Sequence, residues 1–324
     1  MLIETSGLRK TYRSRRGKEE VEAVRGVDLF VEEGEIFGFL GPNGAGKTTT
    51  LRMLATLLEP SGGTARIAGH DLRRNPTDVR RAVGYVGQSG GTWGEVSARE
   101  ELIMQGRLYE MPKAACRERA AELITAFELG EFADRKIKGY SGGQKRRLDV
   151  ALGTVHRPQL LFLDEPTTGL DPQSRAHMWD EVRELRRRGT SIFLTTHYLD
   201  EADALCDRLA IIDGGRIVTE GTPRDLKRQI AGDIVDIGLV APTDRAVGLL
   251  TDKPFVRGIE AGEPDTVGLA TLRLYVDEGS VAVPDILRAL DTADIAPTSI
   301  ELHRPSLDDV FLKQTGRSLR EAAS

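Results

Sequence analysis

Residues 41–48 combine the residue types and the spacing that bind phosphate. Gly41 and Gly46 flank four residues and are followed by Lys47 and Thr48. Glycines let backbone amides approach phosphate oxygens, and a helix that starts at such a loop directs its positive N-terminus at the same anion. Lys47 should contact the β- and γ-phosphates of a nucleotide, and the Thr48 hydroxyl should ligate Mg²⁺. The residues expected to bind the nucleotide are Gly41, Pro42, Asn43, Gly44, Ala45, Gly46, Lys47, Thr48 and Thr49.

Two carboxylates stand at the end of an apolar segment further along the chain. Leu160–Leu163 has the composition of a buried strand, and Asp164 and Glu165 follow it directly. A carboxylate at the tip of a buried strand can lie beside Mg²⁺, and Asp164 is that candidate. Glu165 is placed to orient the attacking water or to accept its proton. A strand ending in a polar turn would look alike, but the phosphate loop upstream favours the catalytic interpretation.

A second candidate anion site lies between these two parts, at Ser141, Gly142, Gly143 and Gln144. Ser141 precedes a helical run, where an N-cap belongs, and its hydroxyl, two glycine amides and the helix N-terminus could together bind an anion. Because the phosphate loop already holds the phosphates of one nucleotide, a second anion site suggests that two copies share two nucleotides. A glycine-containing loop that merely caps a helix remains an equal alternative at this stage.

The segments around these residues predict a large α/β domain. Strand-like runs alternate with helical ones, which favours a largely parallel sheet with helices on both faces. The expected strands are residues 2–8, 21–31, 35–40, 64–68, 82–86, 160–163, 191–195 and 208–212. The expected helices are residues 47–58, an insert that Pro112 interrupts, the run after Ser141, and residues 173–188. Residues 13–20 should form a charged loop, and DNA binding by its basic side chains is the alternative.

The chain changes character after residue 230. Strand-like runs at 234–240, 271–276 and 298–302 alternate with helical ones at 244–250 and 281–290, and neither a glycine loop nor paired carboxylates recur. We expect a small α+β domain over residues 231–316 and a flexible tail over residues 317–324.

Composition limits the classes of function. The 324 residues carry a net charge of −5, with 40% hydrophobic and 29% charged residues, an ordinary globular balance that disfavours a nucleic-acid coat. Cys116 and Cys206 have no metal-ligand spacing and are expected to be free core thiols. The N-terminal residues lack the basic region and apolar run that are typical of a signal peptide. No apolar run approaches the ~20 residues that a membrane-spanning helix needs. We therefore expect action on a membrane to require a partner protein.

In combination, these motifs make residues 1–230 resemble the nucleotide-binding subunit of an ATP-binding cassette (ABC) transporter. The resemblance implies a P-loop NTPase fold in which a RecA-like parallel sheet, an antiparallel β subdomain and a helical insert at about 88–140 form the ATPase core. In this family the serine-glycine-glycine-glutamine signature contacts the γ-phosphate bound to the opposite protomer. The usual leucine before that serine is Tyr140 here, which should leave the phosphate contacts in place.

The resemblance assigns roles to four more residues. Gln88 matches the Q-loop glutamine, a catalytic and Mg²⁺ contact that also relays to the helical insert. Asp171 matches the D-loop that bridges the protomers. His197 matches the switch histidine that senses the γ-phosphate, and Tyr12 matches the aromatic that stacks on adenine. Taken alone, Gln88 would be an ordinary surface residue, Asp171 a turn residue and His197 an incidental side chain.

The C-terminal part narrows the resemblance. Residues 305–312, followed by Thr315 and Gly316, are similar to the tail of daunorubicin-resistance-type ATP-binding subunits, as are residues 52–58. That group implies an ATPase at the cytoplasmic face of a bacterial membrane, held there by a separate multispanning permease and exporting a drug, antibiotic, lipid or polyketide-type compound. We expect Leu307, Val310 and Phe311 to form an amphipathic helix packed on its own domain, with regulation or dimer stabilisation as a secondary hypothesis.

The resemblance also implies a mechanism and its contacts. Two chains, each with ATP and Mg²⁺, close into a homodimer, and hydrolysis at Glu165 lets it relax. The insert docks the permease, with Trp93, Val96 and Leu102 as candidate contacts, although Trp93 could equally be a core residue. The alternatives are a non-transport ABC ATPase in translation or DNA repair and a regulatory ATP-binding module. The single phosphate loop, the lack of a sustained heptad pattern and the intact Glu165 and His197 argue against them.

Overall fold

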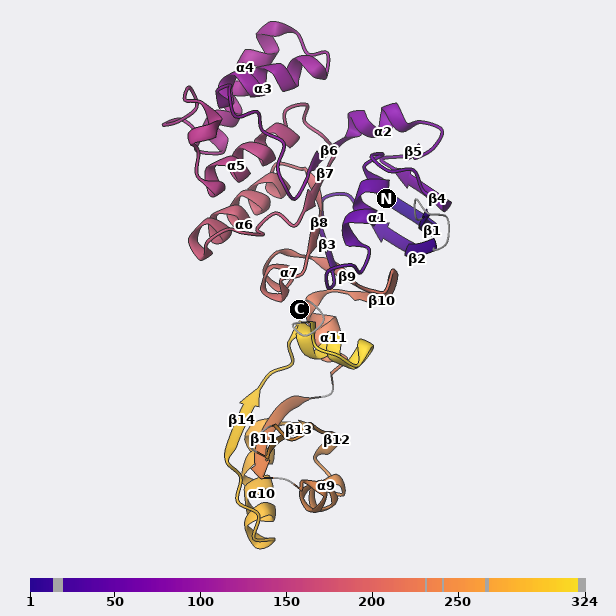
Figure 1. Ribbon diagram of the computed structural model, residues 1–324, viewed down its shortest axis with the longest axis vertical. Coiled ribbons are helices and arrows are strands. Elements are labelled where there is room, and N and C mark those ends of the chain that lie inside the picture. The colour runs from indigo at the N-terminus through magenta and orange to yellow at the C-terminus, as the bar shows by residue number, and fades with distance from the viewer. Residues whose placement is uncertain (14–19, 231, 241, 266–267, 320–324) are drawn as a thin grey trace. The chain divides into compact units, whose positions relative to one another are not determined.

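The computed structural model describes residues 1–13, 20–230, 232–240, 242–265 and 268–319 (Figure 1). The chain forms two compact units, one of residues 1–223 together with residue 319 onward, the other of Arg224–Ser318. The sequence placed this boundary at residue 230. The Lys313 Nζ donates a hydrogen bond to the Gln229 carbonyl at 2.8 Å, which ties residues just before that point to the second unit. Residues 14–19 of the predicted charged loop lie outside the described residues.

A six-stranded sheet in the order β10-β9-β3-β8-β7-β6 forms the centre of the first unit. Its strands are β3 (Ile36–Leu40), β6 (Val83–Val86), β7 (Leu160–Asp164), β8 (Ser191–Thr196), β9 (Arg208–Asp213) and β10 (Arg216–Gly221). All neighbouring pairs are parallel except β9 and β10. Every residue of β3, β7 and β8 is buried, as expected where both faces of a parallel sheet are covered. The predicted parallel α/β sheet is confirmed.

Helices cover both faces of this sheet. In Figure 1, α1 lies on one side of the central strands, and α5, α6 and α7 lie on the other. Their bounds are α1 (Lys47–Leu54), α5 (Gly142–Gly153), α6 (Pro172–Arg187) and α7 (Leu199–Leu205). The Phe193 ring of β8 lies 5.6 Å from Phe37 and 5.7 Å from Phe162 on the neighbouring strands, so aromatic side chains from three strands share one layer of the core.

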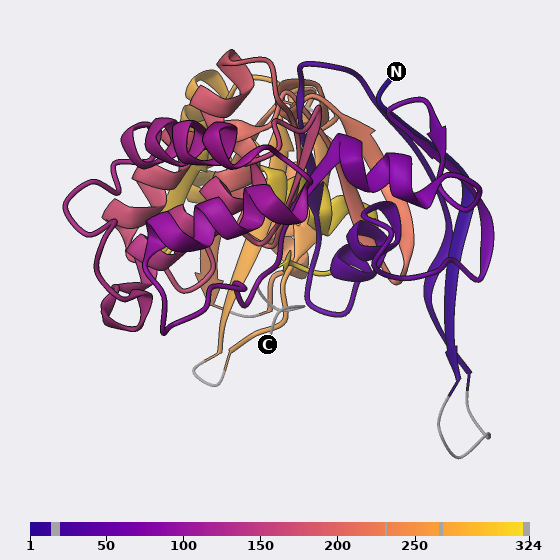
Figure 2. The same ribbon diagram turned by 90° about the horizontal axis from the view of Figure 1, so that it is seen from above.

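An antiparallel sheet packs beside the central one and is drawn in indigo and violet in Figure 2. Its order is β2-β1-β4-β5, with β1 (Ile3–Arg13), β2 (Glu20–Val31), β4 (Gly62–Ile67) and β5 (His70–Asp71), and α2 (Pro76–Ala82) follows. Leu8 and Val27 face each other across β1 and β2, are fully buried, and join the same hydrophobic core as Phe39 and Leu51. The antiparallel β subdomain expected from the resemblance is therefore part of the first unit.

The helical insert contains α3 (Ala98–Leu108), α4 (Lys113–Ala126) and a 3₁₀ turn, η1 (Ile137–Gly139). Ser97 caps α3 in a capping box with Glu100, and Pro112 is the N-cap of α4, so the predicted break at this proline is confirmed. Trp93 is 60% exposed, whereas Leu102 is 1% exposed. Trp93 is therefore not a core residue, and the expectation that Leu102 contacts a partner is wrong, because its side chain belongs to the core.

The second unit contains a βαββαβ arrangement. Its elements are β11 (Asp233–Val240), α9 (Asp244–Thr251), β12 (Val256–Ala261), β13 (Leu269–Val276), α10 (Gly279–Thr292) and β14 (Ser299–His303), with α8 (Pro223–Arg228) before and α11 (Leu307–Thr315) after them. The antiparallel sheet order β12-β13-β11-β14 is that of the ferredoxin-like fold. This specifies the predicted small α+β domain.

The end of the second unit is ordered by short-range contacts. Leu307, Val310 and Phe311 of α11 are at most 2% exposed, which agrees with the expected packing helix. The predicted flexible tail falls mostly on residues 320–324, outside the described residues. In its described part, Ser318 of the second unit donates hydrogen bonds to Asp308, and Leu319, which is grouped with the first unit, is buried.

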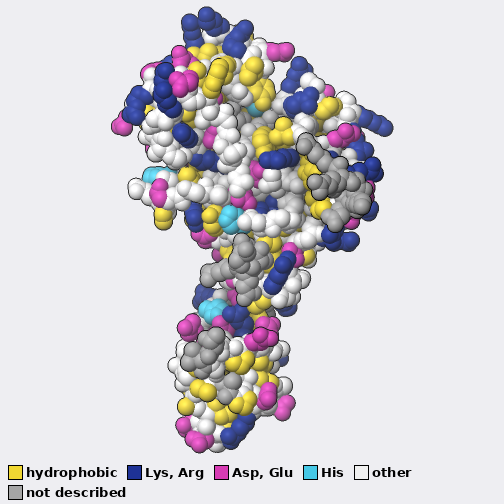
Figure 3. All heavy atoms as spheres, viewed as in Figure 1, with side chains coloured by type: hydrophobic (Ala, Val, Ile, Leu, Met, Phe, Trp, Pro, Cys, Tyr) yellow, Lys and Arg dark blue, Asp and Glu magenta, His cyan; other side chains and the backbone are white. Residues whose placement is uncertain are grey.

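Both cysteines are free and buried, as predicted. Lys and Arg side chains are scattered over the visible face of the first unit, with Asp and Glu between them (Figure 3). Among the described residues, no helix is long and apolar enough to cross a membrane.

Candidate active site

The phosphate loop runs from the end of β3 to the start of α1, in the order that the sequence predicts. Gly46 has a φ of 105°, which favours glycine, and a Cβ on it would lie 2.5 Å from the Ala23 carbonyl oxygen. A Cβ on Gly41 would lie 2.3 Å from the Ile212 carbonyl oxygen. In the described part of the chain, no side chain caps the N-terminus of α1, and the first turn of α1 contains no acidic residue. The amides at this terminus are therefore left without a capping side chain.

Lys47 is 4% exposed and reaches the mouth of its own loop. Its ammonium donates to the carbonyl oxygens of Gly41 at 2.7 Å and Pro42 at 3.1 Å, and lies 3.4 Å from Glu165 Oε1. Burial lowers the pKa of Lys47, while the charges of Glu165 and Asp164 act in the opposite direction. A cation is thus held between the first carbonyl oxygens of the loop and the Glu165 carboxylate.

Asp164 is fully buried and is bound by two hydroxyls. Thr48 Oγ1 donates to Asp164 Oδ1 at 2.9 Å, and Thr195 Oγ1 donates to the same oxygen at 2.7 Å. The other oxygen, Oδ2, has no hydrogen-bond partner among the described residues. An unsatisfied carboxylate oxygen beside a threonine hydroxyl is a donor set that suits Mg²⁺, so these residues fit the ion that the sequence predicts.

Glu165 occupies a tight turn directly after β7. Its φ is 47°, and its amide donates to both the carbonyl and the hydroxyl oxygen of Thr195 at 3.1 Å. Its Oε2 accepts hydrogen bonds from Gln88 Nε2 at 2.9 Å and Thr168 Oγ1 at 3.1 Å. Oε2 also lies 3.3 Å from His197 Nδ1, close enough for an ion pair but without hydrogen-bond alignment. Backbone and side-chain contacts together fix this carboxylate.

The electrostatics keep Glu165 ionised. Burial acts to raise the pKa of Glu165, but His197, Lys47 and Thr168 stabilise the charged form and bring the pKa from an ordinary 4.5 to about 2. An ionised carboxylate can accept a hydrogen bond or a proton from water.

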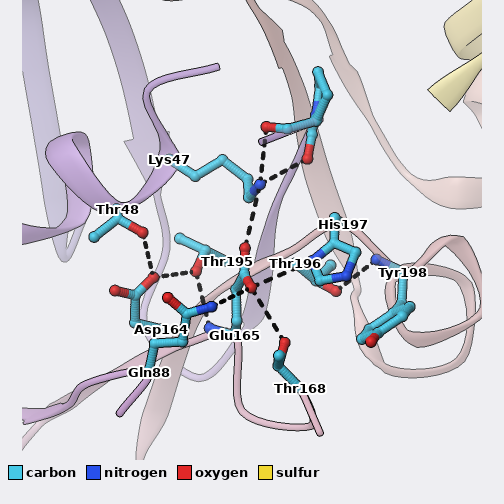
Figure 4. Close-up of polar contacts among 12 residues, drawn as sticks. Lys47, Thr48, Gln88, Asp164, Glu165, Thr168, Thr195, Thr196, His197 and Tyr198 are labelled. Atoms are coloured by element: carbon cyan, nitrogen blue, oxygen red, sulfur yellow. Dashed lines mark hydrogen bonds and ion pairs between the residues drawn. The ribbon is translucent and has the colours of Figure 1, made fainter. Parts of the chain in front are cut away.

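These side chains meet because they follow neighbouring strands at one edge of the sheet. Figure 4 shows Thr48 and Thr195 turned toward Asp164, and Lys47, Gln88 and His197 turned toward Glu165. Gln88 follows β6, Asp164 ends β7, and His197 follows β8, while the phosphate loop follows β3. The carboxyl ends of parallel strands are the usual place for such a site. With Thr195 as the bridge between Asp164 and Glu165, polar contacts join six of the residues singled out in the sequence: Lys47, Thr48, Gln88, Asp164, Glu165 and His197.

The Ser141 segment forms the N-terminus of α5. Ser141 Oγ accepts a hydrogen bond from the Gln144 amide at 3.2 Å, and Gln144 Oε1 accepts one from the Ser141 amide at 2.9 Å, which completes a capping box. Tyr140 is buried, and its hydroxyl donates to the Phe132 carbonyl at 2.5 Å. The Tyr140 side chain, which stands where the family usually has leucine, therefore lies in the core, and Ser141 and Gly142 remain exposed.

Asp171 lies beside this segment. It caps α6 by accepting hydrogen bonds from the Ser174 amide and hydroxyl at 2.8 and 2.7 Å. A Cβ on Gly143 would lie 3.0 Å from Ser174 Oγ, so the two loops approach closely. Tyr12 is 43% exposed on β1, with the Lys10 ammonium 5.5 Å from its ring. No hydrogen bond or ion pair in the described part of the chain connects Ser141, Asp171 or Tyr12 with Lys47 or Glu165.

Sequence reasoning missed three residues that support the site. Thr195 and Thr168 hold Asp164 and Glu165, and Arg146 is 7% exposed and donates to the carbonyl oxygens of Pro166, Gly87 and Asp164 at 2.7, 2.6 and 3.1 Å. Arg146 thereby connects α5 to the turns that carry Gln88 and Glu165. Its only sequence signal is its position five residues after Ser141, which does not reveal its partners.

Known proteins are similar to this chain in sequence and in fold. A family model described as "ABC transporter" matches residues 24–168, and one described as "ATP-binding protein DrrA1-3-like, C-terminal domain" matches residues 221–315. The chain is 46% identical to the daunorubicin/doxorubicin resistance ATP-binding protein DrrA of Streptomyces peucetius, over 99% of this chain and 96% of the relative. It is 40% identical to the doxorubicin resistance ATP-binding protein DrrA of Mycobacterium tuberculosis, over 97% and 94%.

A solved structure agrees with these relatives. The dimeric post-hydrolysis state of the ATP-binding cassette MJ0796 bound to ADP and Pi superposes with a TM-score of 0.62 and 26% identity, over 68% of this chain and 98% of that one. The fold and the site thus define an ATP-binding cassette ATPase. The chain belongs to the ABC transporter family, as one of its ATP-binding proteins with a DrrA1-3-like C-terminal domain. The transport branch is supported, and the translation, DNA-repair and regulatory alternatives are not.

Proposed function

We propose that this ATPase works as a homodimer at the cytoplasmic face of a bacterial membrane and drives a separate multispanning permease. The cargo class that the relatives' names suggest is a drug or antibiotic, exported from the cell. The observation that supports the shared-site part of this proposal is that Ser141 and Gly142 are exposed, and that no polar contact in the described part of the chain joins Ser141 to Lys47 or Glu165. An exposed helix N-terminus has use for a γ-phosphate only when a second copy presents its own phosphate loop.

Each residue has a proposed role in hydrolysis. The amides of Gly41–Thr49 and the Lys47 ammonium bind and orient the phosphates, and Tyr12 stacks on the adenine. Mg²⁺, when bound by Thr48, Gln88 and Asp164, supplies positive charge that polarises the phosphate oxygens. Glu165 orients the attacking water and accepts its proton, because it is ionised and its carboxylate is held by four neighbours.

The other residues connect the two halves of the proposed dimer. Ser141–Gln144 of one copy bind the γ-phosphate held by the other, and Asp171 lies at the seam between them. His197 senses the γ-phosphate, since its ring already faces Glu165. The ATP-binding domain is proposed to cover residues 1–230, with the C-terminal domain, residues 231–316, packing on itself through α11.

Co-purification tests the transport part of this proposal. A tagged full-length chain, expressed in its source cell and extracted in mild detergent, should retain one multispanning membrane protein. Loss of that membrane protein should make the cell sensitive to the same compounds as loss of the ATPase. Purification of an ATPase that never retains a multispanning partner would contradict a transport role.

A further inference from the structure

Glu201 of α7 is a buried carboxyl group to which the proposed steps of hydrolysis assign no role. Its side chain is 0% exposed. Its Oε1 accepts a hydrogen bond from Trp179 Nε1 of α6 at 3.3 Å, and its Oε2 has no hydrogen-bond partner among the described residues. Burying a carboxyl group that is only partly bonded costs free energy, so its presence here needs an explanation.

Glu201 lies between the segments that carry Glu165 and His197. Thr167 belongs to the turn after Glu165, and Thr196 ends β8 directly before His197; both threonines are fully buried. Burial raises the pKa of Glu201, while the hydroxyls of Thr196 and Thr167 act to lower it. The carboxyl group is therefore close to both of the segments that meet at the site of hydrolysis.

Arg175 of α6 contacts the same segment at a second point. Its Nη1 donates to Asp200 Oδ2 at 3.2 Å, and its guanidinium lies 4.4 Å from the centre of the Tyr198 ring. The Tyr198 ring lies 4.1 Å from the His197 ring, and the Tyr198 amide donates to Thr196 Oγ1 at 2.9 Å (Figure 4).

The two contacts come from one face of one helix. Arg175 and Trp179 are four residues apart in α6, so their side chains project in the same direction. Residues 196–201 are thus attached to α6 at both ends of a short stretch, and His197 lies within that stretch. Its Nδ1 lies 3.3 Å from Glu165 Oε2.

We propose that Glu201 is a positioning residue for His197: by anchoring residues 196–201 to α6 and to the turn after Glu165, it holds the imidazole ring beside the Glu165 carboxylate. Glu201 acts through His197 and does not itself touch the nucleotide. The inference rests on the proposed role of His197 and adds the residue that keeps the ring in place. Removing the anchor should leave nucleotide binding intact and slow the hydrolysis step.

Steady-state kinetics of the full-length chain provide the first test. Glu201→Leu keeps the size of the side chain but has no polar atom, so kcat should fall about tenfold or more while KM for ATP stays within about twofold. Glu201→Gln can still accept the Trp179 hydrogen bond, so its kcat should lie within about threefold of the parent's. Asp203→Asn, on the exposed part of the same helix, is the control and should match the parent.

A double-mutant cycle separates positioning from general damage to the fold. His197→Ala alone should lower kcat, and adding Glu201→Leu to it should lower kcat no further, because the ring to be positioned is already gone. A purely structural role of Glu201 would instead make the two effects multiply. Trp179→Phe, which removes only the indole donor, should lower kcat about threefold in the parent and leave His197→Ala unchanged. This milder variant provides the same cycle if Glu201→Leu does not fold.

NMR of the nucleotide-free chain reports on the ring directly. The chain has five histidines, and the imidazole signal of His197 is identified by its loss in His197→Ala. That signal should shift in Glu201→Leu and in Trp179→Phe and keep its place in Asp203→Asn. An unmoved signal, parent-level kcat in Glu201→Leu, or effects that multiply in the double variant would overturn the inference. If His197→Ala hydrolyses ATP at the parent rate, the proposed role of His197 fails instead, and the NMR signal still decides whether Glu201 positions the ring.

Discussion

Glu165 shows how much of the chemistry is decided at a single residue. Its carboxylate contacts Gln88, Thr168, Lys47 and His197, which come from four separate segments. Three of these neighbours are also assigned to the nucleotide or its metal ion. The carboxylate is therefore expected to respond to nucleotide occupancy, because three of its neighbours are proposed ligands of the nucleotide or of its metal ion.

Replacing Glu165 with Gln should abolish hydrolysis and preserve ATP binding. Gln has the same size but cannot accept a proton, so turnover should fall about 10²-fold or more. ATP should then hold the two copies together, which size-exclusion chromatography with ATP and Mg²⁺ would detect as a stable dimer. Glu131→Gln, on the exposed surface, is the matched control. Hydrolysis at the parent rate in Glu165→Gln would refute the assignment.

The depressed pKa of Glu165 also predicts a pH dependence of stability. A carboxyl whose pKa falls from 4.5 in the unfolded chain to about 2 in the folded one stabilises the fold above pH 4.5. That contribution is lost as the pH falls from about 4.5 towards 2. As the pH falls through this window, the melting temperature of the parent should therefore fall relative to that of Glu165→Gln, whose side chain does not titrate. A difference that stays constant with pH would mean that the carboxyl does not titrate as described.

At the scale of elements, α5 combines two functions at one terminus. Ser141 and Gln144 satisfy each other's backbone amides, as Ser97 and Glu100 do at α3. In α5, however, the same serine is proposed to meet a phosphate. Arg146, one turn further along α5, donates hydrogen bonds to the turns that carry Gln88 and Glu165. The same helix therefore carries Ser141, which is proposed to bind the partner copy's phosphate, and a residue that supports the active site of its own copy.

A pair of serine variants separates capping from phosphate binding. Ser141→Ala and Ser97→Ala each remove an N-cap and should each cost about 1 kcal/mol of unfolding free energy, measured by urea denaturation. Only Ser141→Ala should lower ATP hydrolysis, and the larger Ser141→Arg should abolish it. Nucleotide binding to the single chain should be unchanged in all three. If Ser141→Ala and Ser97→Ala hydrolyse ATP at equal rates, Ser141 acts only as a helix cap and does not bind phosphate.

At the scale of the whole molecule, the shared-site proposal predicts complementation between inactive chains. Lys47→Ala has no working phosphate loop but an intact Ser141, and Ser141→Arg has the reverse. Each alone should be inactive. In an equimolar mixture, random pairing of a two-fold dimer leaves roughly a quarter of the sites intact, and the measured ATPase activity should reach about that fraction of the parent's. If the mixture is no more active than either variant alone, the proposal that a single intact shared site hydrolyses ATP in a mixed dimer is contradicted.

The sequence by itself determined the local motifs and the sheet that carries them. The phosphate loop depends on glycines at fixed spacing, and the strand before Asp164 is apolar throughout, so both are readable from neighbouring residues. Elements with weak or short patterns were missed, namely β5, α2, α7, α8, β10 and β12. Their positions depend on packing against distant segments, which outweighs local propensity.

Only the tertiary structure decided which side chains meet. Gln88 and Glu165 are 77 residues apart, and their contact exists because β6 and β7 are parallel neighbours that end at one edge. The support by Thr195 and Arg146 likewise depends on contacts between distant segments, and so does the Oδ2 of Asp164, which is buried with no hydrogen-bond partner among the described residues. Residue type and spacing therefore defined the chemistry, while strand order and burial decided where that chemistry is assembled and where a partner is needed.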